Sequence, residues 1–411
     1  MSEPRQAAHD AAALAARAAY GRLVAWLAAR WRDVAAAEDA LGDALVAALE
    51  TWPRDGVPDK PEAWLYTTAR RRLLDAARRA SVRAEAGPDL KVLMDDTDVA
   101  RDGLFPDERL KLLFVCAHPA IDEAVRTPLM LQAVLGLDAA RIAAAFLVAP
   151  ATMGQRLVRA KAKIRDAGIR FDVPEARELR PRLDAVLEAI YAAYGTGWDD
   201  GAGADPRRSG LAEEAVWLGR LITRLLPDEP EALGLLALML HCEARRAARR
   251  DVAGRYVPLS AQDTARWSEP MIEEAEATLA AAAEHGAPGR FQLEAAIQSA
   301  HAQRAVRGRT DWDAIALLYE GLLRIAPTLG ARVGHAAALA EAKGADAGLA
   351  ALAAIPAEAV ATYQPYWALR AHLLAALARA GEARDSYARA IGLSEDPAVR
   401  EFLRARAEAV E

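Results

Sequence analysis

Residues 137–161 read LDAARIAAAFLVAPATMGQRLVRAK, and this stretch decides how the surrounding chain folds. Two segments with apolar residues at three- and four-residue spacing flank a short turn that ends at Pro150, which predicts a helix-turn-helix. Asp138 can cap the first helix. The residues expected to face inward are Ile142, Ala143 and Phe146 in the first helix and Met153, Leu157 and Ala160 in the second.

The outward side of the second helix carries side chains that suit a nucleic acid. These are Thr152, Gln155, Arg156, Arg159 and Lys163. Arginine can bridge two acceptors on a guanine edge and glutamine can do so on adenine, whereas threonine and lysine can hold phosphates. A solvated basic face on an ordinary helical hairpin is the alternative interpretation of this segment taken alone.

The same helical spacing extends over almost the whole chain. No convincing run of alternating valine, isoleucine or threonine marks a strand, so an all-α protein is expected. The length of 411 residues suggests two to four domains. Proline and glycine clusters near residues 52–58, 86–88, 148–150, 173–174 and 195–206 divide the chain into three blocks.

Composition and sequence patterns argue against several classes of function. No apolar run is long enough to cross a bilayer and the N-terminus lacks the pattern of a secretory signal, so a cytoplasmic protein without membrane contact is expected. Cys116 and Cys242 have no metal-type spacing partner, which argues against a disulfide framework and a zinc site. The seven histidines are scattered, so neither an enzyme nor a cofactor is predicted. The net charge of −6 still allows local basic faces.

The first block ends in a very basic helix. Its cationic residues are Arg70, Arg71, Arg72, Arg78 and Arg79. Such a row favours phosphates at any sequence, although a solvated surface is the simpler alternative. Trp64 and Tyr66 precede it and could stack on unpaired bases, but Trp64 at helical spacing is expected to pack in the core.

Segments 37–45 and 63–70, on either side of Trp52 and a loop, resemble region 2 of the extracytoplasmic-function (ECF) sigma factors of bacterial RNA polymerase. The resemblance implies that Glu38, Asp39 and Asp43 contact the beta-prime clamp helices of core RNA polymerase. It also implies that the loop 53–60 and the basic helix bind the minus 10 element of promoter DNA.

Residues 107–165 resemble region 4 of the same family, which reads the minus 35 element and meets the beta flap. The resemblance assigns minus 35 contacts to the outward side chains of the second helix named above. The expected domains are therefore 1–88 for region 2, 89–105 for an acidic linker, 106–173 for region 4, and 174–411 for an extension. The linker could thread toward the RNA path of polymerase or be a plain tether.

The extension is expected to be an α-solenoid. Residues 366–390 follow the tetratricopeptide pattern of two antiparallel helices, and residues 311–319 and 230–240 look like weaker copies. Together with residues 227–240, 262–267 and 310–312, the order of segments resembles the ECF subfamily with a tetratricopeptide-like C-terminal extension. A regulatory or docking role for it, through a protein or ligand partner, is a hypothesis.

Some positions depart from the family pattern. Arg71 stands where an asparagine is often found, and Gly42 and Leu45 stand where glutamine and phenylalanine are common. These departures put the minus 10 base preference and the affinity for the clamp in doubt. The alternative function is a polymerase-independent helix-turn-helix regulator or a repeat-type interaction adaptor.

Overall fold

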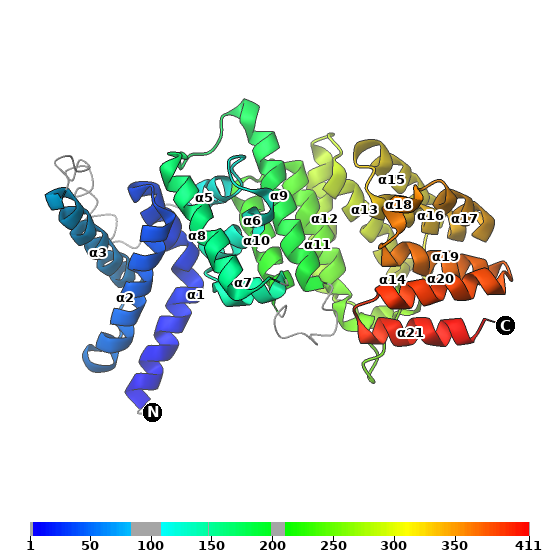
Figure 1. Cartoon of the computed structure of the whole chain (residues 1–411), viewed down its shortest axis with the longest axis horizontal. Helices are drawn as coiled ribbons and strands as arrows, with labels where there is room; N and C mark the ends of the chain where they lie inside the picture. The colour runs from blue at the N-terminus through cyan, green and yellow to red at the C-terminus, as the bar shows by residue number, and fades with distance from the viewer. Residues whose placement is uncertain (1–2, 84–107, 147, 199–209, 411) are drawn as a thin grey trace. The chain divides into compact units, whose positions relative to one another are not determined.

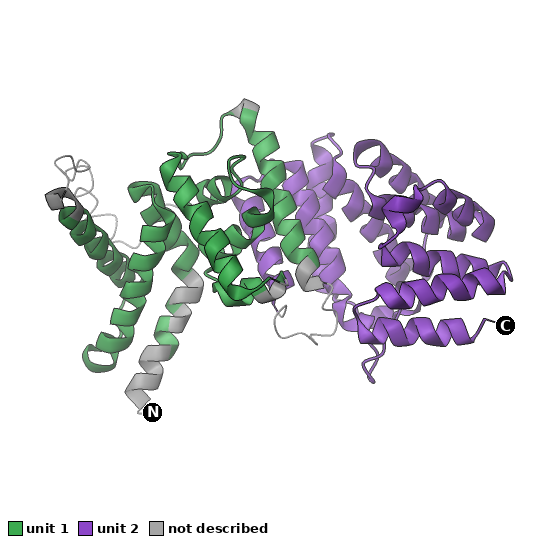
Figure 2. Ribbon diagram, in the orientation of Figure 1, with its two compact units in different colours: residues 1–196 green, residues 197–411 purple. Residues whose placement is uncertain are grey.

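The computed structural model describes residues 3–83, 108–146, 148–198 and 210–410. Within these ranges the chain is helical and contains no strand, with one isolated β-bridge between Arg250 and Tyr256. The predicted all-α fold is confirmed. The chain divides into two compact units, residues 1–196 and residues 197–411 (Figure 2).

The first unit begins with three long helices that pack on one another: α1 (Glu3–Trp31), α2 (Val34–Asp55) and α3 (Pro61–Arg83) (Figure 1). Helix α2 starts where it does because the Asp33 side chain accepts a hydrogen bond from the Ala36 N–H at 3.0 Å. The Trp26 ring packs on Tyr66 with centroids 4.1 Å apart, which fixes α3 against α1. Their common core also contains Leu23, Leu27, Val34, Leu41, Trp52, Leu65 and Leu73.

Four shorter helices follow in the same unit: α5 (Arg109–Cys116), α6 (Glu123–Leu135), α7 (Ala139–Ala145) and α8 (Pro150–Asp166). Asp138 accepts a hydrogen bond from the Arg141 N–H at 2.8 Å, as expected for a capping residue. Ile142 and Ala143 are buried, Phe146 is half-buried, and the predicted inner stripe of α8 is buried throughout. Helices α7 and α8 thus pack together as a helical hairpin.

These helices pack directly on the first three. Helix α1 contacts α5 and α6, and α2 contacts α8. Gly21 in α1 lies so close to α6 that a Cβ atom there would fall 1.9 Å from the Val134 carbonyl oxygen. A glycine at this position therefore allows the two helices to approach at backbone distance.

Helix α9 (Ala176–Trp198) lies almost wholly in the first unit, where the Arg182 guanidinium donates to the Phe114 carbonyl at 2.7 Å. The extension is expected to start at residue 174, so the compact units divide later in the chain than the expected domain boundary. The predicted acidic linker, residues 89–105, lies outside the described residues.

The second unit is a succession of helices. They are α10 (Leu211–Leu225), α11 (Pro230–Ala244), η1 (Arg246–Arg249), η2 (Leu259–Ala261), η3 (Thr264–Arg266), α12 (Glu269–Glu284), α13 (Arg290–Ala302), α14 (Arg304–Arg307), α15 (Trp312–Ile325), α16 (Leu329–Lys343), α17 (Ala345–Ala353), α18 (Ala357–Val360), α19 (Gln364–Ala376), α20 (Ala380–Leu393) and α21 (Pro397–Glu408).

Neighbouring helices of this unit pack in sequence, among them α15 on α16, α16 on α17 and α19 on α20. The segment 366–390 forms the expected two helices, and Asp311 caps α15 by accepting from the Ala314 N–H at 3.1 Å. Separate apolar clusters centre on Ile315 and on Tyr387. Local clusters between successive helices are consistent with a solenoid-like arrangement.

Candidate polymerase and nucleic-acid interfaces

The outer side of α8 presents the polar residues that the sequence analysis selected. Thr152, Gln155, Arg159 and Lys163 are exposed, and Arg156 is half-buried. This division follows from the helical period, because Met153, Leu157, Ala160 and Ile164 fill the opposite side. Pro150 at the first position of α8 fixes where that surface begins.

Three of these side chains share one pocket. Arg156, Arg159 and Lys163 line it together with residues 120–122, 124 and 125 from the start of α6. Asp122 is the carboxylate in this group, and its Oδ1 already accepts from the Ala124 N–H at 2.9 Å. The side of α8 toward α6 is therefore a concave surface rich in cations, a surface that suits phosphate oxygens.

The arginines of α3 are spread along its outer surface. Arg71, Arg72, Arg78 and Arg79 are exposed and Arg70 is half-buried. Two of them contact Asp75 on the same helix: Arg78 lies 3.7 Å from the Asp75 carboxylate, and the Arg79 side chain donates to the Asp75 carbonyl. Cations on exposed side chains keep their charge available to a polyanion.

The aromatic residues before this row are packed inside the unit. Tyr66 is buried against Trp26, and Trp64 is half-buried with its ring edge-to-face on Trp52 at 5.5 Å. Packing of Trp64 agrees with the expectation from its helical spacing. The buried Tyr66 ring therefore offers no free face on which an unpaired base could stack.

The acidic residues of α2 differ in exposure. Asp43 is exposed, with its carboxylate 3.9 Å from the Arg72 guanidinium. Asp39 is exposed, but only 9% of the side chain of Glu38, one helical position earlier, remains exposed. The three residues expected to meet one partner therefore do not form a single open surface.

Glu38 is buried because α8 covers it. Its Oε2 lies 2.5 Å from the Lys161 ammonium, and 9% of the Glu38 side chain and 11% of the Lys161 side chain remain exposed. Burial raises the pKa of Glu38, and Lys161 opposes that shift. A second pair joins the same helices, with Arg165 3.7 Å from the Asp33 carboxylate.

Lys161 is not among the site residues predicted from the sequence. One signal was present: position 161 adjoins the inner apolar stripe of α8, next to Leu157, Ala160 and Ile164. A lysine at the margin of such a stripe covers apolar surface with its stem and needs an acceptor for its ammonium. The identity of that acceptor, 123 residues earlier in the chain, required the tertiary structure.

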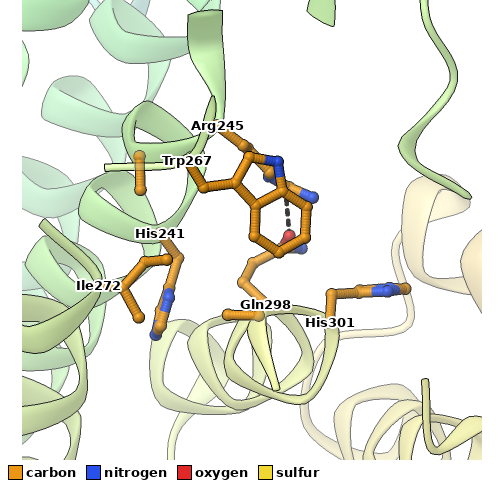
Figure 3. A pocket seen from close by; sticks show the side chains of 8 residues that line it. His241, Arg245, Trp267, Ile272, Gln298 and His301 are labelled. Carbon is orange, nitrogen blue, oxygen red and sulfur yellow. Dashed lines mark hydrogen bonds between the residues drawn. The ribbon is translucent and has the colours of Figure 1, made fainter. Parts of the chain in front are cut away.

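The second unit contains a small pocket between α11, α12 and α13 (Figure 3). Its labelled lining residues are His241, Arg245, Trp267, Ile272, Gln298 and His301. The space is of the order of one water molecule, too small for an organic ligand. The Arg245 guanidinium donates to Gln298, and Arg304 stacks on Trp267 with 5.1 Å to the ring centroid.

The pocket histidines are neutral at pH 7. Burial and then the Arg245 charge lower the pKa of His241 to about 4, and burial with Arg245 and Arg304 lowers the pKa of His301 to about 4. In the described part of the chain, neither ring nitrogen of His241 has a hydrogen-bond partner. Its Nε2 lies 3.7 Å from the Glu276 carboxylate.

Comparison with known proteins gives a family match for two segments of the chain. The model of sigma-70 region 2 matches residues 17–83, which comprise the second half of α1 and all of α2 and α3. A family of unknown function (DUF6596) matches residues 182–283. An uncharacterized protein of Rhizobium meliloti (strain 1021) is 39% identical over 381 residues, which cover 91% of this chain and 90% of that protein. The chain belongs to the same family as that protein. No solved structure matches this chain.

The sigma-70 region 2 domain supports a function as an RNA polymerase sigma factor. Region 2 holds the row of arginines on α3 and the acidic residues of α2, so both groups belong to a domain that binds core polymerase and promoter DNA. No helix among the described residues has the length and apolarity to span a membrane. The described residues also contain no cluster of His, Cys, Asp and Glu that could hold a metal.

Proposed function

We propose that this chain is an ECF-type sigma factor, which binds core RNA polymerase and directs it to promoters. The match of residues 17–83 to sigma-70 region 2 carries this proposal. The chain would act in the cytoplasm and would catalyse no bond chemistry itself. Its contribution would be recognition of two promoter elements and help in opening the duplex.

The minus 10 element would bind region 2. Exposed arginines of α3 would hold phosphates, and residues 53–60 would read bases, although the predicted loop is shorter than expected because α2 continues to Asp55. Arg72 is already paired weakly with Asp43, and a contact between two exposed side chains is exchanged easily for a phosphate. The cations proposed for this role are Arg70, Arg71, Arg72, Arg78 and Arg79.

The minus 35 element would bind a region 4 built on α7 and α8. Gln155 and Arg156 would read base edges in the major groove, and Thr152, Arg159 and Lys163 would fix the helix on the backbone. The exposure of the outer side of α8 and its shared basic pocket with α6 support this assignment. Region 4 would also meet the beta flap of polymerase.

The beta-prime clamp helices would bind the acidic side of α2 through Glu38, Asp39 and Asp43. The extension, expected from residue 174 onward as a tetratricopeptide-like solenoid, would modulate activity through a protein or ligand partner. Its succession of packed helices supports that role, since such arrays present extended binding surfaces.

Run-off transcription with purified core polymerase tests the proposal. The full chain should direct promoter-dependent transcripts from a library of candidate promoters, and core polymerase alone should not. A matched variant, Arg71→Glu with Arg72→Glu, should retain the fold and lose promoter opening. No core binding together with no promoter-dependent transcript would refute the proposal.

The alternative is a polymerase-independent regulator that uses α8 on an operator. Its supporting observation is that the outer side of α8 is exposed in the free chain. Tight sequence-specific binding of the isolated chain to duplex DNA, unchanged by core polymerase, would favour that function. Weak binding that becomes specific only with core polymerase would favour the sigma factor.

A further inference from the structure

We propose that the pocket between α11, α12 and α13 binds a monoatomic anion, a halide such as chloride, through the guanidinium of Arg245 and the ring of His241 (Figure 3). The site goes beyond the proposed function and does not depend on it. A bound ion would join three helices of the second unit and make the stability of that unit depend on the anions in solution.

The size of the pocket restricts the ligand to one small species. The space is of the order of one water molecule, and the labelled side chains surround it (Figure 3). A halide ion is close to a water molecule in size, whereas phosphate, sulfate and organic carboxylates need more room. The choice is therefore between a water molecule and a single ion, and the charge around the pocket favours an anion.

Two guanidinium groups at the pocket have neutral partners. Arg245, which lines it, donates to the Gln298 side-chain oxygen. Arg304, which stacks on Trp267 of the pocket wall, donates to backbone carbonyls within residues 259–262. Neither arginine forms an ion pair with a carboxylate in the part of the chain that the structure describes. Positive charge that has no paired carboxylate favours a negative ligand.

His241 is a buried polar group whose ring has no partner. Its side chain is 1% exposed and lines the pocket, and neither ring nitrogen has a hydrogen-bond partner among the described residues. A buried N–H without an acceptor is unfavourable, and an anion would accept its hydrogen bond. Gln298 also retains N–H donors, because Arg245 occupies its oxygen. Three side chains thus supply donors to one small space, which is the chemistry that holds an anion.

One carboxylate lies close to the pocket but does not fill this role. Glu276 Oε1 is 3.7 Å from His241 Nε2, too far for a hydrogen bond, and it accepts from the Ser299 hydroxyl at 2.6 Å. The Glu276 side chain is 36% exposed, so water screens its charge. Burial and then the Arg245 charge lower the pKa of His241, which indicates a positive potential at the ring.

Binding of the anion and binding of a proton should favour each other. His241 and His301 have pKa values of about 4 because burial and the arginine charges disfavour the imidazolium. A bound anion offsets those charges and raises both pKa values, so protonation in turn strengthens anion binding. The anion should therefore bind more tightly as the pH falls from 7 to 5. The other ionisable groups around the two rings are Arg245 and Cys242 of α11, Glu276 of α12 and Arg304 of α14.

Crystals of the full chain grown in sodium bromide test the location of the site. Anomalous scattering should place a bromide ion within hydrogen-bond distance of Arg245 and His241. In solution, broadening of the chloride NMR signal should give a Kd for chloride that falls on the order of tenfold from pH 7 to pH 5. Gluconate at the same ionic strength should not displace chloride, because it exceeds the size of the pocket.

Substitutions at His241 test its role. His241→Phe removes the ring N–H and should abolish the chloride broadening, whereas His285→Phe, the same change on an exposed residue, should leave it unchanged. His241→Gln keeps a neutral donor and should retain chloride binding with a Kd that depends less on pH. Should His241→Phe fail to fold, the pH dependence in His241→Gln still decides.

Two outcomes would overturn the proposal. If the pocket contains no bromide and chloride broadening is the same for His241→Phe and His285→Phe, it holds water and not an anion. An equal pH dependence of the Kd in wild type and His241→Gln would remove His241 from the site. Neither outcome affects the proposed sigma factor function, which run-off transcription tests separately.

Discussion

Glu38 of α2 and Lys161 of α8 form a buried ion pair, with Oε2 and Nζ 2.5 Å apart although the residues are 123 positions apart in the sequence. This pair links two segments that the sequence analysis treated as separate modules. The chain therefore holds its N-terminal helices and the hairpin of α7 and α8 in one compact unit.

Lys161→Met should lower the free energy of unfolding of the first unit by up to about 3 kcal/mol, because it leaves a buried carboxylate without its counter-charge. Urea denaturation followed by the fluorescence of the buried Trp26 and Trp52 measures this loss. Arg170→Met, on an exposed side chain, should change the value by less than about 0.5 kcal/mol. Equal effects of the two substitutions would contradict the structural role of the pair.

The decrease in the free energy of unfolding caused by Lys161→Met should be smaller at lower pH. Burial raises the pKa of Glu38, so the folded chain takes up this proton more readily than the unfolded chain. Protonation of Glu38 therefore stabilises the folded chain increasingly as the pH falls through the folded-state pKa of Glu38. In the variant, this protonation also removes the negative charge that has lost its partner. Denaturation at pH 8 and pH 5 should therefore give a smaller difference between wild type and variant at pH 5. A constant difference would show that Glu38 is hydrated in the variant.

Two glycines should respond to alanine in opposite directions. A Cβ at Gly21 would lie 1.9 Å from the Val134 carbonyl oxygen, so Gly21→Ala should force α1 from α6 and destabilise the unit by about 1 to 3 kcal/mol. A Cβ at Gly42 meets nothing within 4 Å inside α2, so Gly42→Ala should stabilise it by up to about 1 kcal/mol. Thermal unfolding of both variants checks the two predicted changes in stability. A lower melting temperature for Gly42→Ala would contradict the second prediction.

Arg156→Ala and Arg79→Ala should separate base reading from phosphate binding in the proposed complex with polymerase. Loss of Arg156 should cost about 1 to 3 kcal/mol at one position of the minus 35 element if its contact is bidentate. Arg79→Ala should weaken binding on all promoters by a similar factor and reduce its salt dependence. Binding of the polymerase complex to promoters with single base changes measures both effects. A uniform loss for Arg156→Ala would refute its assignment to a base.

The second unit should lose stability on mild acidification. His241 and His301 have folded-state pKa values of about 4, whereas an unfolded histidine titrates near pH 6.5. The unfolded chain thus binds more protons between these limits, so their contribution is complete above about pH 6.5 and falls toward pH 4, by about 1 to 2 kcal/mol per histidine from pH 7 to pH 5. Unfolding of His241→Gln should depend less on pH than wild type. His285→Gln, on an exposed residue, should behave as wild type.

Much of the local structure could be predicted from the sequence because it depends on neighbours in the chain. The apolar spacing of Met153, Leu157 and Ala160 identified the buried side of α8, and Asp138 is the capping residue that its position predicted. The exposed outer side of α8 followed from the same period. The helical character of the whole described chain needed no more than this spacing and the absence of strand patterns.

Only the tertiary structure decided which of the charged candidates are open to a partner. The sequence placed Glu38, Asp39 and Asp43 on one acidic helix, but burial of Glu38 depends on α8, which no local pattern connects to α2. The close approach of Gly21 to Val134 is equally non-local. Helical periods are set by backbone geometry within a few residues, whereas the choice of packing partner depends on side chains that meet only after the chain has folded.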